Sequence, residues 1–233
     1  MNRGNVDHDV TIEACVDSLE SAIAAERGGA DRLELCADLN LGGTTPSLDV
    51  FSAVKSRVAI PVFVMVRPRG GDFVFSGDEL EAMRRAIDAF SEAGAGGLVT
   101  GILTIEGRID QTRTRDLVMR AGTLPVTFHR AFDVAPEPPA AVDALADCGV
   151  RRLLTGGGPL TALEGLDSLA ALVERARDRV VIMAGGRVRG ENVARIVARS
   201  RVREVHARCE LEANRVAAIK RALTGAQGQI ARA

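Results

Sequence analysis

The sequence contains no tryptophan and no tyrosine, and it has only seven phenylalanines. Proteins that bind bases or sugars commonly stack them on aromatic rings, so this composition argues against such a function. The formal net charge of −1 points the same way, because no strong field would attract DNA, RNA or an anionic membrane. We therefore expect neither a nucleic-acid nor a membrane partner.

Lysine is almost absent as well. Lys55 and Lys220 are the only two, and nearly all of the 30 basic residues are arginines. A Schiff-base or P-loop mechanism would have to use one of these two lysines. Both fall in predicted helices and not at strand ends, so a Schiff-base aldolase is not expected.

The chain also lacks a long hydrophobic run. The longest strongly apolar stretch, Val58–Val66, has nine residues and contains Pro61, whereas roughly 20 are needed to span a bilayer. Residues 1–9 are polar and do not resemble a signal peptide. We expect a soluble, cytoplasmic protein.

The four cysteines have irregular spacing and form no CxxC motif, so they do not predict a disulfide framework. Reduced thiols are expected at Cys15, Cys36, Cys148 and Cys209.

Short apolar segments alternate with segments of helical periodicity from end to end, as in proteins with a parallel sheet. The predicted strands are Val10–Cys15, Arg32–Cys36, Val62–Val66, Gly97–Gly101, Val126–His129, Arg152–Thr155, Val180–Ala184 and Glu204–His206. Capping-box spacing predicts helix starts at Asp17–Glu20, Ser76–Glu79 and Thr161–Glu164. The last helix is expected over Glu212–Leu223.

Eight β/α units predict a single-domain α/β protein, a closed (β/α)₈ TIM-type barrel over residues 10–225, between polar tails at 1–9 and 226–233. A doubly wound open sheet is the alternative. It is disfavoured because no GxGxxG motif follows the first strand.

Active sites of such barrels lie at the carboxyl ends of the strands. Glu13 and Cys15 end the first strand, and Glu34 and Cys36 end the second with the same spacing. Residues two apart share a strand face, so each glutamate should lie beside its cysteine. Carboxylates in apolar strands need partners, and Arg67, after the third strand, is the expected one. The cluster predicts either a buried ionic network or a pocket for a small ligand or metal.

Polar residues also follow the other strands. For an enzyme, we expect Glu13 or Glu34 as the base and Arg67 with Arg69 holding an anion. His129 would be the acid, oriented by Asp133 or Asp72. Glycine-rich turns after strands can cradle an anion with their N–H groups. The candidate substrate-binding residues are Arg69, Asp72, Thr155, Gly185, Gly186 and His206.

The thiols Cys15 and Cys36 allow two interpretations. They are either small buried packing residues or a pair of soft ligands for one Cu(I) ion.

Several long motifs resemble the CutC family, which is named for copper homeostasis. They run in order through most of the chain and include Glu13–Ser18, Glu26–Arg32, Glu34–Cys36, Gly42–Ser47, Arg67–Phe73 (RPRGGDF), Gly97–Gly101, Pro125–Asp133 (PVTFHRAFD), Leu154–Gly156, Ala162–Leu166, Met183–Gly186 and Glu204–His206.

The resemblance implies a TIM-type barrel in the cytoplasm, self-association as a dimer or tetramer, and Cu(I) binding or trafficking through Cys15 and Cys36. The alternative is a lyase, isomerase or hydrolase that acts on a small anionic or polyhydroxyl substrate in the Glu/Arg/His pocket. The sequence departs from the family pattern after His206, where a short connection replaces the usual longer loop.

Overall fold

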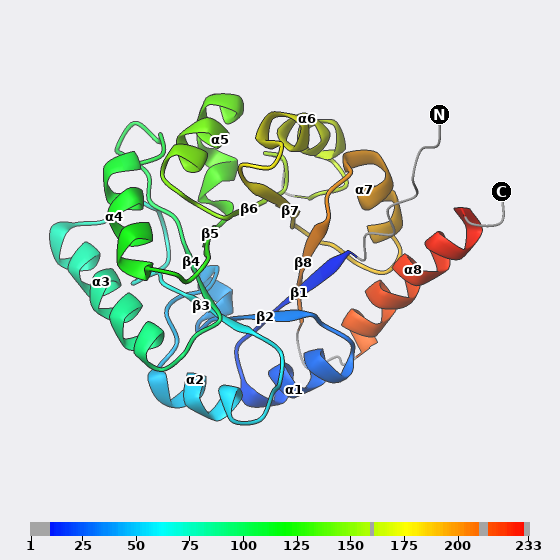
Figure 1. Cartoon of the computed structure of the whole chain (residues 1–233), viewed down its shortest axis with the longest axis horizontal. Coiled ribbons are helices and arrows are strands. Elements are labelled where there is room, and N and C mark those ends of the chain that lie inside the picture. Colours follow the sequence, from blue (N-terminus) through cyan, green and yellow to red (C-terminus); the bar gives the residue numbers. More distant parts are fainter. Residues whose placement is uncertain (1–9, 159–160, 210–213, 231–233) are drawn as a thin grey trace.

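The computed structural model describes residues 10–158, 161–209 and 214–230. Eight parallel strands close into a barrel in chain order, with β1 pairing β8, and helices surround it (Figure 1). The expected barrel is confirmed, and so are all eight strands, whose ends differ from the expected ones by at most two residues. The strands are β1 Thr11–Val16, β2 Arg32–Leu35, β3 Val62–Met65, β4 Gly97–Thr100, β5 Val126–Phe128, β6 Arg152–Thr155, β7 Val181–Ala184 and β8 Glu204–Arg208.

Eight α-helices and two short 3₁₀ helices connect and cover the strands in the described residues. They are α1 Leu19–Arg27, η1 Leu39–Leu41, α2 Leu48–Lys55, α3 Gly77–Glu92, α4 Gln111–Ala121, η2 Arg130–Val134, α5 Pro138–Asp147, α6 Leu166–Ala176, α7 Val193–Ser200 and α8 Asn214–Ile230. Among the described residues, none of these helices has the length and apolar character needed to cross a membrane.

The helix starts follow local capping chemistry. Ser76 and Glu79 form the expected capping box at α3. At α1 the cap is Ser18, which exchanges hydrogen bonds with Ser21, one residue later than expected. The expected start at Thr161–Glu164 was wrong: α6 begins at Leu166.

The last helix also differs from its expected range. It extends to Ile230 and does not stop at Leu223, so the expected tail from residue 226 is partly helical. The glycines at 225 and 228 are tolerated because a glycine costs a helix only about 1 kcal/mol relative to alanine. The expected start at Glu212 lies outside the described residues.

Because side chains alternate in direction along each strand, they pack either between the strands and the helices or inside the barrel. On β1, Ile12, Ala14 and Val16 point outward into the large core between strands and helices. The barrel interior holds a separate, smaller apolar group made of Cys15, Cys36, Phe63, Met65 and Val99, with Leu39 packed on it. Charged side chains also lie inside the barrel.

Those charged side chains form one buried network toward the amino-terminal ends of the strands. Arg32 donates to Glu13 and to Glu204, with N–O distances of 2.5 Å in both pairs. Arg152 donates to Glu204, also at 2.5 Å. The guanidinium groups of Arg32 and Arg152 lie 5.0 and 5.4 Å from the ring centre of Phe63. The network therefore joins β1, β2, β6 and β8 across the barrel.

Candidate functional site

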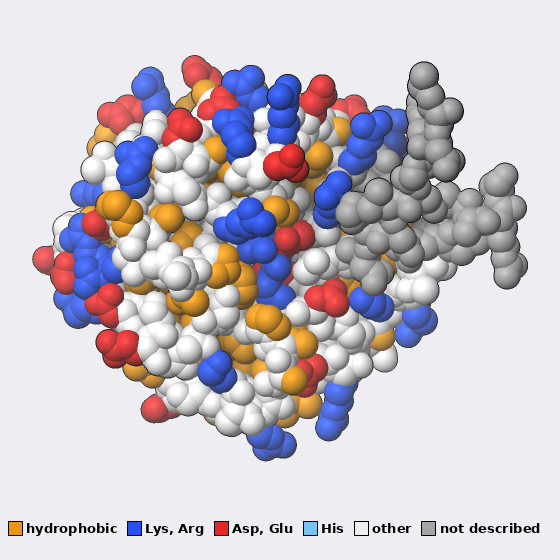
Figure 2. Space-filling view, viewed as in Figure 1, with side chains coloured by type: hydrophobic (Ala, Val, Ile, Leu, Met, Phe, Trp, Pro, Cys, Tyr) orange, Lys and Arg blue, Asp and Glu red, His pale blue; other side chains and the backbone are white. Residues whose placement is uncertain are grey.

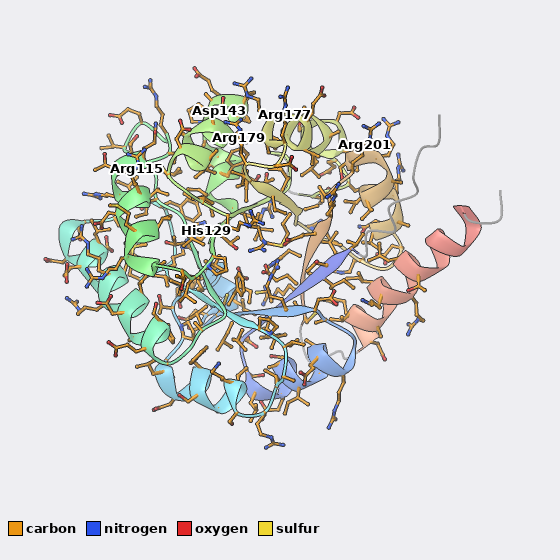
Figure 3. The ribbon with its side chains drawn as sticks, in the orientation of Figure 1. Arg115, His129, Asp143, Arg177, Arg179 and Arg201 are labelled. Atoms are coloured by element: carbon orange, nitrogen blue, oxygen red, sulfur yellow. The ribbon has the colours of Figure 1, made fainter. Side chains whose placement is uncertain are left out.

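A cavity of about 470 Å³ opens at the carboxyl ends of the strands, where the sequence predicts the site. It is lined by Cys15, Glu34, Cys36, Leu39, Leu41, Gly42, Met65, Arg67, Phe73, His129, Arg130, Ala131, Asp133, Val134, Leu154, Gly158, His206 and Arg208. Figure 3 shows His129 inside the ring of helices, whereas Arg115 and Arg201 lie farther out. Of the four side chains expected together at this mouth, Glu34, Arg67 and His129 line the cavity, and Glu13 does not.

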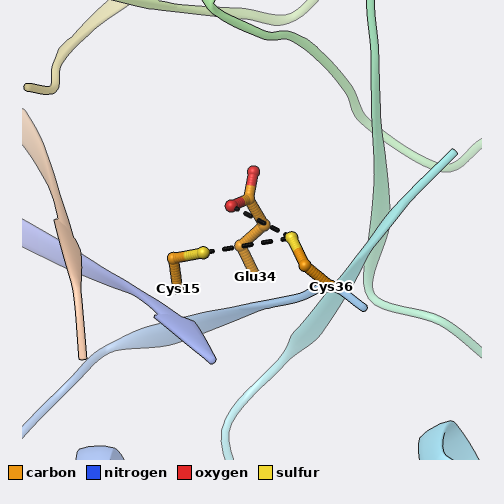
Figure 4. Close-up of side chains that lie close together, drawn as sticks. All are labelled: Cys15, Glu34 and Cys36. Carbon is orange, nitrogen blue, oxygen red and sulfur yellow. Dashed lines mark hydrogen bonds between the residues drawn. The ribbon is translucent and has the colours of Figure 1, made fainter. Parts of the chain in front are cut away.

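Cys15, Glu34 and Cys36 form a compact cluster in this cavity (Figure 4). The two sulfur atoms are 3.9 Å apart, and the Cys36 sulfur lies 3.6 Å from Oε2 of Glu34. One donor atom from each of the three residues lies within 4.8 Å of the other two. The strand register produces this proximity, because Cys15 pairs with Glu34 across β1 and β2. The thiols thus face the mouth and not the helices.

Both thiols are protonated at neutral pH. The hydrogen bond with Cys36, burial and the nearby Glu34 charge raise the pKa of Cys15 well above its ordinary value. The hydrogen bond with Cys15 lowers the pKa of Cys36, but burial and the Glu34 charge outweigh it and raise that pKa to about 11. A bound metal would therefore have to displace protons from this pair.

His206 lies between the two glutamates. Its Nδ1 is 2.9 Å from Oε1 of Glu13, and its Nε2 is 3.8 Å from Oε2 of Glu34. Burial opposes the charged form of the ring, but the Glu34 charge, Cys15 and Glu13 raise the pKa of His206 well above its ordinary value. The ring is therefore an imidazolium that links the cavity to the charged network beneath it.

The pKa values of the two glutamates are shifted in opposite directions. Burial alone would raise the pKa of Glu13, but the hydrogen bond from His206 and the Arg32 charge hold it at about 2. Burial raises the pKa of Glu34, and the His206 charge offsets this only in part. Glu34 Oε1 is buried without a hydrogen-bond partner. Glu34 belongs to the cavity, whereas Glu13 lies below it and is absent from its lining.

The expected pairing of Arg67 with the glutamates was wrong. Its guanidinium donates to the backbone carbonyls of Leu41, Gly43 and Gly71, at 3.2, 3.1 and 2.8 Å. Arg32 holds Glu13 in its place, because these two residues are register partners on β1 and β2. Arg32 opens a strand and not a loop, which is the signal that could have identified it.

His129 is not oriented by a carboxylate, contrary to expectation. Its Nδ1 accepts a hydrogen bond from the Ala131 N–H at 3.2 Å, so its proton is on Nε2. Nε2 is buried and has no partner. Burial, with the charge of Arg67, lowers the pKa of His129 to about 3. The ring is neutral and presents an unused N–H donor.

Asp133 and Asp72, the expected partners of His129, are engaged elsewhere. Asp133 accepts hydrogen bonds from Arg130, from Thr155 and from the N–H groups of Gly156 and Gly158. It therefore holds the turn after β6.

Asp72 accepts from Arg69 at 2.9 Å, and Arg69 also binds Glu79 at 2.6 Å. Neither Asp72 nor Arg69 lines the cavity, because the two hold the loop before α3 together.

In the turn after β6, the N–H groups that were expected to cradle an anion are used within the protein. The Gly156 and Gly158 N–H groups are used by Asp133, and that of Gly157 by Thr155 Oγ1. The Gly185 N–H donates to the carbonyl of Thr155, and the carbonyl of Gly186 accepts from Ala162. Of the six candidate substrate-binding residues, only His206 lines the cavity.

An eight-stranded parallel barrel with ionisable side chains at its carboxyl-end mouth belongs to the TIM-barrel class. Solved enzymes of this class superpose on the chain. Thiamine phosphate pyrophosphorylase from Pyrococcus furiosus is 13% identical with a TM-score of 0.64, covering 95% of this chain and 99% of that one. Phosphoribosylanthranilate isomerase from Thermotoga maritima is 14% identical with a TM-score of 0.61, covering 93% and 99%. At these identities the likeness shows the fold alone.

Comparisons with protein families are more specific than this likeness in fold. The CutC family model matches residues 10–210. The human copper homeostasis protein cutC homolog is 48% identical over 90% of this chain and 76% of its own length. A CutC family protein from Xanthomonas campestris is 44% identical over 84% and 82%.

The crystal structure of CutC from Streptococcus agalactiae has a TM-score of 0.81 at 35% identity, covering 84% of this chain and 97% of that one. The chain belongs to the CutC family and is a homologue of copper homeostasis proteins.

Proposed function

We propose that this protein binds Cu(I) through the thiolates of Cys15 and Cys36 and handles it as cargo. The single observation that carries the proposal is the 3.9 Å separation of the two sulfur atoms, at the floor of a cavity that opens to solvent. Metal–sulfur bonds of about 2.3 Å each would let one ion reach both atoms. Soft thiolate ligands select Cu(I) over the harder divalent cations.

The charges around the pair support a bound monovalent cation. Two thiolates and one Cu(I) carry a net charge of −1, and Glu34 adds a further negative charge. The His206 imidazolium, 3.8 Å from Glu34, and the buried Arg67 guanidinium in the same lining offset that charge. Met65 also lines the cavity and adds a thioether, another soft donor type.

The test is competition for Cu(I) against a chromogenic chelator in anaerobic buffer. Wild-type protein should take up about one equivalent, since only one such thiol pair exists among the described residues. The double variant Cys15→Ala, Cys36→Ala should lose this uptake. Cys148→Ala and Cys209→Ala are matched controls, because both of these thiols are buried elsewhere in the fold. Uptake that survives the double change would make Cys15 and Cys36 packing residues.

A second function is favoured by the polar atoms that lack partners. Glu34 Oε1, Arg67 Nε and His129 Nε2 are all buried without hydrogen bonds, and all three residues line one cavity. This arrangement suits a lyase, isomerase or hydrolase acting on a small anionic or polyhydroxyl substrate. Incorporation of solvent deuterium into small hydroxy and keto acids, followed by NMR, tests it. Exchange by wild type that Glu34→Gln abolishes would support a lyase or isomerase, and absence of exchange would count against these two activities.

The proposed cellular setting is the cytoplasm, with the chain self-associated as a dimer or tetramer. The four thiols are all unpaired, as a reducing compartment maintains them. Large apolar side chains on the surface, such as Ile105 and Met119, support self-association. Light scattering during size-exclusion chromatography would give the mass, and a monomer at micromolar concentration would contradict self-association.

A further inference from the structure

Three arginines are buried in the described part of the chain, and they differ in their partners. Arg32 and Arg152 each meet at least one carboxylate at ion-pair distance. Arg67, which is only 4% exposed, meets no carboxylate within that distance among the described residues. Its terminal nitrogens bind only backbone carbonyls, and its Nε–H has no acceptor. Buried charges are nearly always paired, so this cation lacks an anion.

His129 supplies a second unused donor in the same place. Because Nδ1 accepts from the Ala131 N–H, the ring donates only through Nε2, which is buried without a partner. The Phe73 ring lies close to both Arg67 and His129. The Arg67 guanidinium lies 4.8 Å from its centre, and the His129 ring centre lies 5.1 Å from it. The Arg67 guanidinium and the His129 ring thus lie beside the same aromatic ring, and all three residues line one cavity.

The other residues that line the cavity indicate what kind of molecule carries the anionic group. Leu41, Met65, Phe73, Val134 and Leu154 give the cavity apolar walls. Its volume of about 470 Å³ lies in the range of pockets for small organic molecules. A ligand with one anionic end and an apolar body fits these surroundings.

We propose that Arg67 Nε–H and His129 Nε2–H form a binding site for the carboxylate of a small organic acid. A carboxylate is planar and offers two oxygens, which two N–H donors can bind separately. A phosphate would need more donors, and the backbone N–H groups of Gly156, Gly157 and Gly158 are already used within the protein. The site deepens the second proposed function by naming its ligand class, and it does not depend on copper.

The experiment measures binding of benzoate and pentanoate to the full-length protein by calorimetry, each beside its neutral amide. Both carboxylates should bind in the millimolar range or tighter, and the amides at least about tenfold more weakly, because a hydrogen bond to a charged group is lost. Inorganic phosphate is the third probe. Phosphate binding tighter than either carboxylate, or equal binding of acid and amide, would overturn the proposal, as would no binding of either acid.

Single substitutions test whether benzoate binds at Arg67 and His129. Arg67→Gln and His129→Phe should each weaken benzoate binding by about tenfold or more, while Arg84→Gln, on the surface of α3, leaves it unchanged. Because Arg67 also braces loop carbonyls, the His129 variant keeps the test valid if Arg67→Gln fails to fold. In ¹⁵N-labelled protein, the His129 Nε2–H resonance should shift on adding benzoate, and an unchanged resonance would contradict the proposal.

The same variants separate this site from copper binding. Cys15→Ala, Cys36→Ala should lose Cu(I) and keep benzoate, and His129→Phe should do the reverse. Loss of both ligands in both variants would overturn the assignment of two distinct subsites.

Discussion

Arg32 donates its Nε–H to the carboxylate of Glu13 across neighbouring strands, at 2.5 Å, in the interior of the barrel. The same guanidinium donates through a second nitrogen to Glu204 of β8. Arg152 also reaches Glu204, but it does not reach Glu13. Arg32 is therefore the residue that two buried carboxylates share, while Glu13 also contacts His206 and Glu204 also contacts Arg152.

Replacing Arg32 with methionine should strongly destabilise the protein. The change leaves Glu13 without its arginine in a fully buried position, and breaking a buried ion pair typically costs about 3–5 kcal/mol. Urea unfolding followed by circular dichroism would measure it. Arg120→Met is the control, because its ion pair with Asp88 lies on the surface and should matter little. Equal unfolding midpoints for the two variants would contradict the buried network.

His129 should make the protein sensitive to mild acid. Its pKa is about 3 in the folded state, below the ordinary value of 6.5. As pH falls from 6.5 toward 3, the unfolded chain takes up a proton that the folded protein does not, so stability is lost. His129→Phe removes this contribution, and the slope of unfolding free energy against pH should decrease by up to about 1.4 kcal/mol per pH unit. Parallel slopes for wild type and variant would show that the pKa of the ring is the same in the folded and the unfolded protein.

Gly101 leaves room for the His129 ring. A Cβ added at this position would lie 2.5 Å from Nδ1 and Cε1 of the ring, closer than atoms can pack. Gly101→Ala should therefore displace His129 and break the hydrogen bond from the Ala131 N–H. We expect a shift of the His129 ring resonances and a loss of stability of about 1–3 kcal/mol. Unchanged His129 resonances would mean that β4 moves to accommodate the methyl group.

Asp133 should control the order of the turn after β6. Removal of its carboxylate in Asp133→Ala leaves the Gly156 N–H without its acceptor, and amide hydrogen exchange at this residue should accelerate. The expected loss of stability is about 1–3 kcal/mol. Asp133→Asn keeps one carbonyl acceptor and should recover part of the protection. Slow exchange at Gly156 in both variants would contradict this role.

The strands were predictable because each is a short apolar run bounded by polar or glycine residues, as parallel strands buried on both faces are. The shared face of Glu13 with Cys15 and of Glu34 with Cys36 followed from strand periodicity alone. The partner of Glu13 did not, because only the register of β1 against β2 places Arg32 opposite it. Sequence spacing carries no information on that register, so Arg67, the more prominent motif residue, was expected in its place.

The sequence also predicted the helix starts only in part. The Glu164 N–H donates to Thr161 Oγ1 at 3.2 Å, as in a capping box, and the Thr161 hydroxyl donates to the Glu164 carboxylate at 2.6 Å. These bonds close a turn ahead of α6. A capping pattern reports local hydrogen bonding, and where the helix begins depends on how the next turn packs.

The surface bears out the composition. Figure 2 shows basic and acidic side chains intermixed around the edge of the visible face, consistent with the net charge of −1.

The charged network inside the barrel also has a consequence for how the chain can be divided. Its members come from β1, β2, β6 and β8, so the beginning and the end of the polypeptide each hold charges that the other neutralises. A fragment made of the first four β/α units would enclose Glu13 and Arg32 without Glu204 or Arg152, and would lack the strand that completes the ring. Half-barrels of this protein should therefore be less stable than the closed ring.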